Sequence, residues 1–338
     1  MAYDTVRTKM GDLGITRPIP SRPKVEFMES AKEVGNLLDR ITSIPKIKID
    51  PLPQLKEIGR EQEQVLLFSD SQVGQQTPQF NSKVFLEEMK TLQDRVQKLC
   101  LLQRRIAPVK RLSVFFLGDI IENERVGYQV SLEELEKVVL DQIFEISTPS
   151  ISNMLVNFLQ VYEQIDCFCV RGNHGNIGKF AATTTNWDTI VYKILELRLK
   201  EFDRIKWHIE DKHFYQVAQV MDWKYLLIHG DLIPSWMGIP HYGLERRMSR
   251  LKINLPVDFH MVCLGHFHST NLFRYGGIPT ILNGTFSFGS DYPLQKLGLA
   301  DTPTQWSFFV HEDRPIVAPY EIELRPGMWR SKLIRPNG

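Results

Sequence analysis

The sequence predicts an α/β protein in which two β-sheets pack face to face and helices cover their outer surfaces. Between residues 61 and 205, short apolar runs alternate with longer stretches of helical periodicity, the pattern of strands followed by helices. After residue 205 the expected strands are shorter and follow one another closely, with turn signals such as YGGIP between them. Two stacked sheets with helices on their outer faces accommodate both the alternating part, up to residue 205, and the strand-rich part after it.

The apolar runs predict ten strands, at 64–69, 112–117, 165–170, 206–210, 213–220, 225–228, 259–264, 271–275, 278–282 and 306–311. Helical spacing predicts helices at 82–104, 131–163, 188–202 and 242–252. We expect a break near Pro149 in the second of these, because proline removes a backbone donor inside a helix. Ser131 and Glu134 have the spacing of a capping box at its start.

Residues 1–60 differ in pattern from the rest of the chain and are interpreted as an N-terminal arm. Proline-rich stretches at 16–24 and 45–53 flank residues 25–41, whose apolar positions have the spacing of one amphipathic helix. This helix docks either on the main body of the chain or on a protein partner, which includes a second copy of the chain. The main domain is expected at 61–325, with a C-terminal tail at 326–338.

Composition narrows the class of protein. At 338 residues and 43% hydrophobic, the chain can form one large or two moderate domains. A net charge of +1 provides no overall field that steers the protein to nucleic acid or to an acidic membrane, although local basic clusters can still bind phosphate. We expect no membrane association, because no apolar run approaches the roughly 18 residues that span a bilayer. The N-terminus lacks a secretory signal, and the four cysteines are expected as buried free thiols in a reducing cytoplasm.

Five short segments that come directly after predicted strands carry side chains of the kinds that bind metals. They are SDSQ (69–72), GDIIEN (118–123), GNHG (172–175), HGD (229–231) and GHFH (265–268). Any one of them alone would be weak evidence, since a single HGD is usually a structural turn. Because ligand sites of open α/β sheets gather at the carboxyl ends of strands, all five segments can converge on one site.

This ordered set resembles the calcineurin-like metallophosphoesterase superfamily, whose pattern is D-x-H, G-D-x-x-D, G-N-H, a single His, and G-H-x-H. The superfamily includes lambda phosphatase and SbcD-type nucleases, and the resemblance covers roughly residues 64–311. GIPHYGLERR (238–247) and NGTF (283–286) resemble a phage or prokaryotic branch, which would place the protein in a bacterial or host cytoplasm. The resemblance implies a four-layer α-β-β-α sandwich of two mixed sheets, with a metal site at the carboxyl ends of the strands.

The resemblance implies a site for two metal ions. Asp119 would bridge both ions; the first ion would also take Asp70, Gln72 and His268, and the second Asn173, His229 and His266. Mixed oxygen and nitrogen ligands suit Mn²⁺, Fe or Zn²⁺, whereas Mg²⁺ prefers oxygen alone. We expect Mn²⁺, with Fe, Zn²⁺ and Ni²⁺ as alternatives. The family has histidine where this chain has Gln72. Three interpretations stay open: a weak or second-layer ligand in a two-metal enzyme, an enzyme with one metal, or a loss of activity.

Further residues are implied in catalysis and substrate binding. In the family, the histidine at the position of His174 protonates the leaving oxygen, and a carboxylate orients it; here that carboxylate is Glu122, one methylene longer than the usual aspartate. Arg246 and Arg247, on the predicted helix at 242–252, and Arg171 are candidates for binding substrate phosphate. The alternatives are a solvated helix face for the first two and packing or a surface ion pair for Arg171.

The function predicted from these residues is hydrolysis of a phosphate ester by a two-metal-activated hydroxide, without a covalent enzyme intermediate. We favour a phosphodiester, with nucleic acid as a candidate substrate, because of the local arginines and the nucleases in the superfamily. The alternatives are a phosphomonoesterase that acts on a protein or a small molecule, and a non-catalytic metal-binding assembly module. His174 and Glu122 separate the last alternative from the enzymes, since a structural metal site would need neither.

Overall fold

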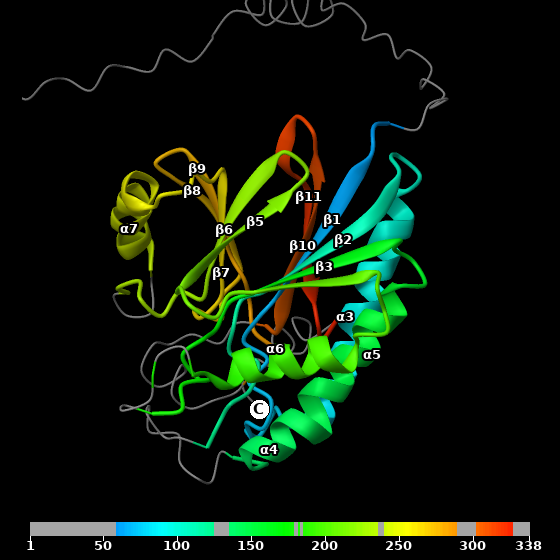
Figure 1. Ribbon diagram of the computed structural model, residues 1–338, viewed down its shortest axis with the longest axis vertical. Coiled ribbons are helices and arrows are strands. Elements are labelled where there is room, and N and C mark those ends of the chain that lie inside the picture. The colour runs from blue at the N-terminus through cyan, green and yellow to red at the C-terminus, as the bar shows by residue number, and fades with distance from the viewer. Residues whose placement is uncertain are drawn as a thin grey trace, which may run out of the picture. The chain divides into compact units, whose positions relative to one another are not determined.

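A computed structural model describes residues 59–124, 135–178, 182, 185–235, 240–288 and 302–326. The predicted N-terminal arm lies outside the described residues except for Gly59 and Arg60, and the C-terminal tail except for its first residue. The capping box predicted at Ser131 and Glu134 also lies outside them. Within the described part, two β-sheets lie face to face (Figure 1).

The first sheet has six strands in the order β11-β10-β1-β2-β3-β4. Its four parallel strands are β1 (Gln62–Phe68), β2 (Val109–Phe116), β3 (Gln164–Cys169) and β4 (Ile205–Ile209). Strands β10 (Thr304–His311) and β11 (Arg314–Glu323) are added antiparallel at one edge. Helical segments connect the parallel strands: α3 (Ser82–Gln103), α4 (Val139–Asp141), η2 (Gln142–Ser147), α5 (Thr148–Phe158) and α6 (Trp187–Arg198).

The second sheet has five strands in the order β5-β6-β7-β9-β8. Its central strands β6 (Trp223–Ile228), β7 (Met261–Leu264) and β9 (Ile278–Leu282) are parallel. The outer strands β5 (Tyr215–Val220) and β8 (Asn271–Tyr275) are antiparallel to their neighbours. Helix α7 (His241–Asn254) covers the outer face of this sheet, as Figure 1 shows.

Three apolar cores separate the four layers. In β1, Leu66 and Phe68 face the core beneath the helices that cover the first sheet, while Val65 and Leu67 face the core between the sheets. The third core lies between the second sheet and α7, where Leu226 packs in the same cluster as Leu244. A strand that is apolar on both faces is expected for a parallel strand covered on both sides. The predicted α-β-β-α sandwich of two mixed sheets is therefore confirmed.

Strand β11 was not predicted, because its sequence has weak strand character. It contains Pro315 and Pro319, is mostly half-buried, and its pairing with β10 has two register shifts. Proline is tolerated in an edge strand, where its missing N–H faces no partner. Among the described strands, β11 pairs with β10 alone and so occupies such an edge.

The helix predicted at 131–163 differs from the structure. The described helical segment begins only at Val139 and ends at Phe158, and Leu135 instead forms an isolated bridge with Gln75. The helix is not interrupted at Pro149, where a break was expected; the π-helical segment η2 passes directly into α5, and Pro149 lies in the first turn of α5. The wider π-helical turn before Pro149 leaves room for the proline ring, which would clash with the carbonyl four residues earlier in a regular α-helix.

Two further expectations concern the cysteines and the membrane. All four cysteines are buried and unpaired, as predicted: Cys100, Cys167, Cys169 and Cys263. No helix in the described part of the chain has the length and apolar character needed to cross a bilayer.

Candidate metal centre

The five predicted segments lie at the carboxyl ends of five strands. The first three come after β1, β2 and β3, which are parallel neighbours in the first sheet. The last two come after β6 and β7, which are parallel neighbours in the second sheet. Hydrogen bonds from Gly265 N–H to the carbonyl of His229, and from His266 N–H to Asp70, link the segments. Each sheet thus brings its segments to one edge, and the Asp70–His266 contact joins the two edges.

The backbone turns sharply at five of the seven predicted metal ligands. These residues have φ in the left-handed region: Asp70 (52°), Gln72 (40°), Asp119 (54°), His266 (71°) and His268 (56°). This conformation is costly for residues other than glycine, although Asp and His adopt it more readily than most. Such strain concentrates at functional sites, where the surrounding structure holds it. Here it turns the chain after β1, β2 and β7.

Glycines let two of these turns approach each other. Gly118 has φ of +90°, and a Cβ placed on it would lie 2.3 Å from the backbone nitrogen of Gly172. A Cβ on Gly172 would in turn lie 2.1 Å from Oδ1 of Asp119. Neither position accepts a side chain without movement of backbone or of the Asp119 carboxylate. The glycines of GDIIEN and GNHG are therefore required for the close contact of these segments.

The tightest cluster is formed by Asp119, Asn173, His229 and His266. His229 Nε2 lies 3.0 Å from Asp119 Oδ2 and 2.9 Å from Asn173 Oδ1. The ligand atoms of Asp119, His229 and His266 all lie within 4.8 Å of one another. Asp119, Asn173 and His229 are buried, and the rings of His229 and His266 are 5.0 Å apart. This arrangement brings together the four ligands expected of the second metal ion.

Hydrogen bonding of His229 shows that this cluster suits a cation. Nδ1 of His229 lies 2.7 Å from the carbonyl oxygen of Leu117, which only accepts, so Nδ1 carries a proton. Nε2 then directs either a second proton or a lone pair at the oxygens of Asp119 and Asn173. Asp119 Oδ2 has His229 Nε2, at 3.0 Å, as its partner. A metal ion would satisfy all three atoms, and a carbonyl that fixes the tautomer is the usual support of a metal-binding histidine.

The ionisation of the cluster without a cation is governed by the same contacts. Burial opposes protonation of His229, but Asp119 outweighs burial and raises the pKa of His229 to about 10. Burial, and then the charge of His229, lower the pKa of His266 to about 3. The pKa of Asp119 is lowered, since His229 and His174 outweigh its burial. The buried carboxylate therefore needs a positive partner, and a proton on His229 is the one that the protein itself supplies.

Asp70, His268 and Gln72 form an adjoining group. Both oxygens of Asp70 accept the His266 N–H at 3.0 Å, and Nε2 of His268 lies 3.4 Å from Asp70 Oδ1. Nε2 of Gln72 lies 3.3 Å from His268 Nε2 and 3.5 Å from His174 Nε2. Gln72 Oε1 is buried and lacks a donor among the described residues. Position 72 thus faces the cluster, and half a turn of the amide would present its oxygen to the same space.

His174 lies between the two groups. Its backbone N–H donates to Asp119 Oδ1 at 2.8 Å, and its Nδ1 lies 3.4 Å from Glu122 Oε2. Nε2 of His174 is 3.9 Å from Asp119 Oδ2. Burial opposes protonation, but Asp119 and then Glu122 raise the pKa of His174 to about 10. The predicted pairing with Glu122 is present, at a long distance, despite the extra methylene.

Asp188 organises the centre from behind and was not predicted from sequence. Its Oδ2 accepts the N–H groups of Asp119 (2.9 Å) and Gly172 (2.8 Å), and its Oδ1 accepts that of Ile120 (3.0 Å). Asp188 is fully buried, and burial, with Asp119 nearby, raises its pKa to about 6. In the sequence it is only an acidic residue in the first turn of a helix, so no local signal indicates these contacts.

Two asparagines also hold the segments together. Asn186 caps α6 by accepting the Asp188 N–H at 2.8 Å, and its Nδ2 donates to the carbonyl of Gly172 at 2.9 Å. Asn123, with φ of 71°, donates from Nδ2 to the carbonyls of His174 (2.9 Å) and Asn176 (3.0 Å). Asn186 at a helix start is recognisable from sequence, but the bond to Gly172 is not.

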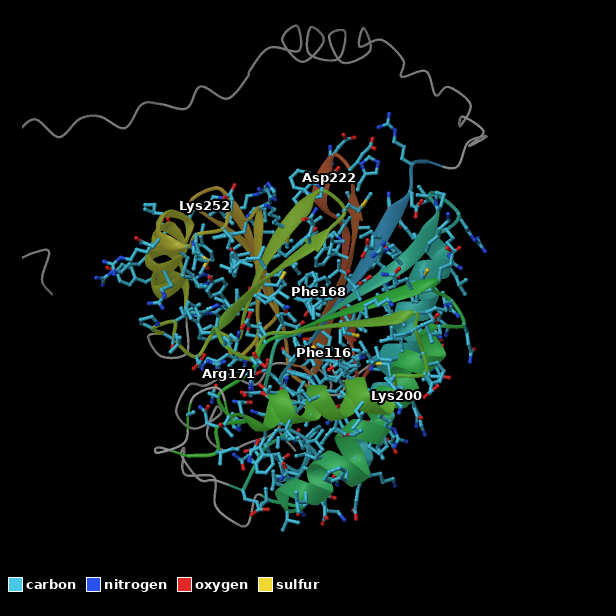
Figure 2. The ribbon with its side chains drawn as sticks, viewed as in Figure 1. Phe116, Phe168, Arg171, Lys200, Asp222 and Lys252 are labelled. Carbon is cyan, nitrogen blue, oxygen red and sulfur yellow. The ribbon has the colours of Figure 1, made fainter. Side chains whose placement is uncertain are left out.

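The three arginines predicted to bind substrate are not part of the cluster. Arg171, labelled in Figure 2, follows β3 and donates from Nη1 to the carbonyl of His213 at 3.1 Å. On α7, Arg246 is exposed and Arg247 is half-buried. Within the described part of the chain, neither forms a hydrogen bond or an ion pair with a predicted metal ligand. Their contact with substrate stays a prediction.

Comparison with known proteins gives weak similarities only. No protein-family model matches the chain, and no curated protein matches its sequence. Among solved structures, an archaeal phosphodiesterase is 12% identical, with 76% of this chain and 99% of that chain covered and a TM-score of 0.37. A predicted phosphoesterase from Streptococcus pneumoniae is 11% identical (77% and 98% covered, TM-score 0.33). Vps29 from Entamoeba histolytica, complexed with zinc, is 12% identical (78% and 99% covered, TM-score 0.34). Similarities of this size do not support an argument about the chemistry of this chain.

Proposed function

We propose that this chain is a metal-dependent phosphoesterase of the calcineurin-like type that hydrolyses a phosphodiester. One observation carries the proposal: Nε2 of buried His229 faces Asp119 Oδ2 and Asn173 Oδ1 at 3.0 and 2.9 Å, while its Nδ1 is held by the Leu117 carbonyl. This is a preformed cation site, and its ligands come from separate strand ends. The sequence motifs that resemble the superfamily supply the rest of the ligand set.

Two divalent ions are proposed, with Mn²⁺ as the preferred metal. Asp119 would contact both; Asp70, Gln72 and His268 would complete one site, and Asn173, His229 and His266 the other. The donor set fits, because carboxylate, amide and imidazole groups converge and the buried Gln72 Oε1 lacks a donor among the described residues. When bound, such ions acidify a water molecule and neutralise the charge on the phosphoryl oxygens.

His174 would act as the proton donor to the leaving oxygen. Its imidazole lies beside the ligands of both proposed ions, 3.5 Å from Gln72 Nε2 and 3.9 Å from Asp119 Oδ2. The Glu122 carboxylate near Nδ1 of His174 keeps a proton on that nitrogen, so that Nε2 of His174 faces the metal centre. Asn123 and the Asp119 carboxylate fix the backbone on both sides of His174. A structural metal site would need none of these contacts, which argues against a non-catalytic module.

The proposal is tested with the full-length protein loaded with Mn²⁺. Substrates are bis-p-nitrophenyl phosphate, p-nitrophenyl phosphate, a dinucleotide, and single- and double-stranded DNA, since nucleic acid is the proposed natural class. Turnover of the diesters is expected. If no substrate is hydrolysed although a titration shows both metal sites occupied, the proposed enzymatic function is refuted. Hydrolysis of the monoester alone refutes the preference for diesters.

Asp119→Asn is expected to abolish turnover and to weaken Mn²⁺ binding, because it removes the shared charge of both sites. Calorimetric titration measures the binding. Retained activity would refute the role of Asp119.

His174→Ala is expected to retain Mn²⁺ and to lower kcat about 10²- to 10⁴-fold on the dinucleotide, whose leaving alcohol needs a proton. His311→Ala, at the last residue of β10, is the matched control and should leave kcat unchanged. An unchanged kcat of His174→Ala on the dinucleotide would contradict the assigned role.

A further inference from the structure

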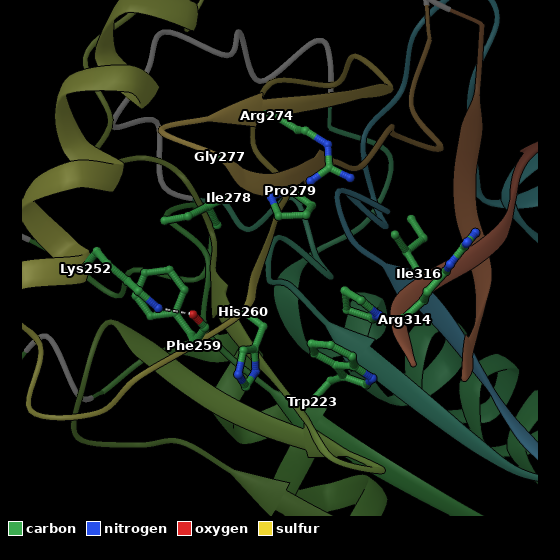
Figure 3. Close-up of a pocket in the computed structure, with 11 residues that line it drawn as sticks. Trp223, Lys252, Phe259, His260, Arg274, Gly277, Ile278, Pro279, Arg314 and Ile316 are labelled. Atoms are coloured by element: carbon green, nitrogen blue, oxygen red, sulfur yellow. Dashed lines mark hydrogen bonds between the residues drawn. The ribbon is translucent and has the colours of Figure 1, made fainter. Parts of the chain in front are cut away.

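A second site lies at the opposite end of the sandwich from the metal centre. The lining of a pocket of about 570 Å³ includes three residues at or just before the starts of strands, namely Trp223 (β6), His260 (before β7) and Ile278 (β9) (Figure 3). His229 and His266 lie beyond the other ends of β6 and β7. His229 is six positions after Trp223, and His266 is six positions after His260, which corresponds to about 20 Å of extended chain. The pocket is therefore separate from the metal centre.

Among the described residues that line this pocket, the ionisable ones are all of basic types: Lys252, His260, Arg274 and Arg314. Lys252 is already engaged, since its ammonium group donates to Asp258 and to the carbonyl of Phe259. Arg274 and Arg314 are exposed, and their guanidinium groups have no hydrogen-bond or ion-pair partner among the described residues. Arg274 comes from β8 and Arg314 from β11, so the two sheets contribute one arginine each (Figure 3).

The wall of the pocket is apolar and held in place. Trp223 donates from Nε1 to the carbonyl of His311 at 2.8 Å, and its ring meets the His260 ring edge to face at 5.1 Å. The backbone N–H of Lys224 fixes His260 through Nδ1 at 2.9 Å, which leaves Nε2–H as a donor. Ile278, Pro279, Pro315 and Ile316 complete the apolar surface. Rigid walls lower the entropy lost when a ligand binds.

We propose that this pocket binds a small organic phosphate that carries an aromatic ring, as a mononucleotide does. A guanidinium group can donate two parallel hydrogen bonds to the oxygens of one phosphate. Two unengaged arginines that line one pocket supply the positive charge that a phosphate needs. The apolar wall gives the ring a surface that inorganic phosphate would not use. The volume lies within the usual range for small-molecule sites. The ligand is either a free nucleotide or the phosphorylated end of an oligonucleotide, which share this chemistry.

Calorimetric titration of the full-length protein with AMP tests the proposal, once with Mn²⁺ and once with a chelator present. We expect AMP to bind under both conditions, because the pocket contains no metal ligand of the centre. Arg274→Ala/Arg314→Ala should weaken this binding at least tenfold. Arg95→Ala, an exposed arginine on α3, is the control and should bind AMP as the parent protein does.

Adenosine and inorganic phosphate separate the two parts of the ligand. Both should bind at least tenfold more weakly than AMP, since each lacks one of the two features. Absence of AMP binding at millimolar concentration, equal binding by the double variant, or equal binding of adenosine would each overturn the proposal. Displacement of AMP by a 5′-phosphorylated tetranucleotide at similar concentration would assign the end of a nucleic acid, and failure to displace it the free nucleotide.

The inference does not depend on the proposed phosphoesterase activity. The double variant should melt at the parent temperature, because both side chains are exposed, and should turn over bis-p-nitrophenyl phosphate at the parent rate. A parent protein that binds AMP through these arginines but hydrolyses no ester would refute the proposed function alone. Ester hydrolysis without AMP binding in the presence of the chelator would refute the pocket alone.

Discussion

Asp188→Asn tests how far a residue that touches no metal controls the metal centre. The carboxylate of Asp188 accepts three backbone N–H groups, two at Oδ2 and one at Oδ1, from the segments that carry Asp119 and Asn173. Asparagine has nearly the same shape but only one accepting atom. If the amide oxygen of the new asparagine takes the position of Oδ2, which accepts two N–H groups, the amide NH₂ group takes the position of Oδ1 and faces the N–H of Ile120. One hydrogen bond is then lost, and one buried donor loses its acceptor.

The magnitude can be worked out from these contacts. A hydrogen bond to a charged acceptor contributes about 1.5–3 kcal/mol, and an unsatisfied buried donor costs about 1–3 kcal/mol. These two costs overlap, so we expect the free energy of unfolding to fall by about 2–4 kcal/mol. For a domain of this size, that corresponds to a decrease of roughly 5–15 °C in Tm. Because the Asp119 and Gly172 turns lose part of their common anchor, Mn²⁺ affinity should also fall, by about tenfold or more.

Urea unfolding and calorimetric Mn²⁺ titration of the full-length protein measure the two effects. Asp203→Asn, in an exposed turn after α6, is the matched control and should change neither. A loss of stability with unchanged metal affinity would show that Asp188 supports the fold but not the centre. A stability change below about 0.5 kcal/mol, the size expected for an ordinary surface substitution, would refute the hydrogen-bond argument altogether.

Two further substitutions test particular side chains. Gln72→His should tighten Mn²⁺ binding, because position 72 faces His268 and imidazole is a stronger ligand than an amide; unchanged affinity in a titration would show that this side chain does not contact the metal. Burial, opposed by Arg325, raises the pKa of Glu88 from 4.5 to about 7. The folded state therefore binds the proton more tightly than the unfolded state, and the free energy of unfolding falls as the pH rises from 4.5 to 7. Glu88→Gln should reduce that fall by about 3 kcal/mol, and equal pH dependence of urea unfolding in both proteins would contradict this.

Much of the fold was predictable because burial leaves a local signal. β1, β2 and β3 are parallel strands covered on both faces, and their apolar runs stand out in the sequence. β11 has no such signal, since an edge strand exposes one face and tolerates proline. The start of the helix expected at 131 was wrong because residues 135–138 are non-helical, and Leu135 pairs with Gln75 from another segment.

The candidate centre shows the same division between local and distant information. Asp119, Asn173, His229 and His266 stand at strand ends, so their convergence results from the direction of the strands. Gln72 could not be placed from sequence, because one step along an extended chain reverses the side to which a side chain points. The structure places it beside His268 and His174.

The sequence by itself determined the kinds of residue at each strand end and their order, because strand direction and the alternation of buried residues are properties of short segments. Tertiary structure decided which distant groups meet. Asp188 accepts the N–H of Asp119 from 69 residues away, and Arg274 and Arg314 reach one pocket from different sheets. Such contacts depend on how strands align and how layers pack, and neither is encoded within a single segment.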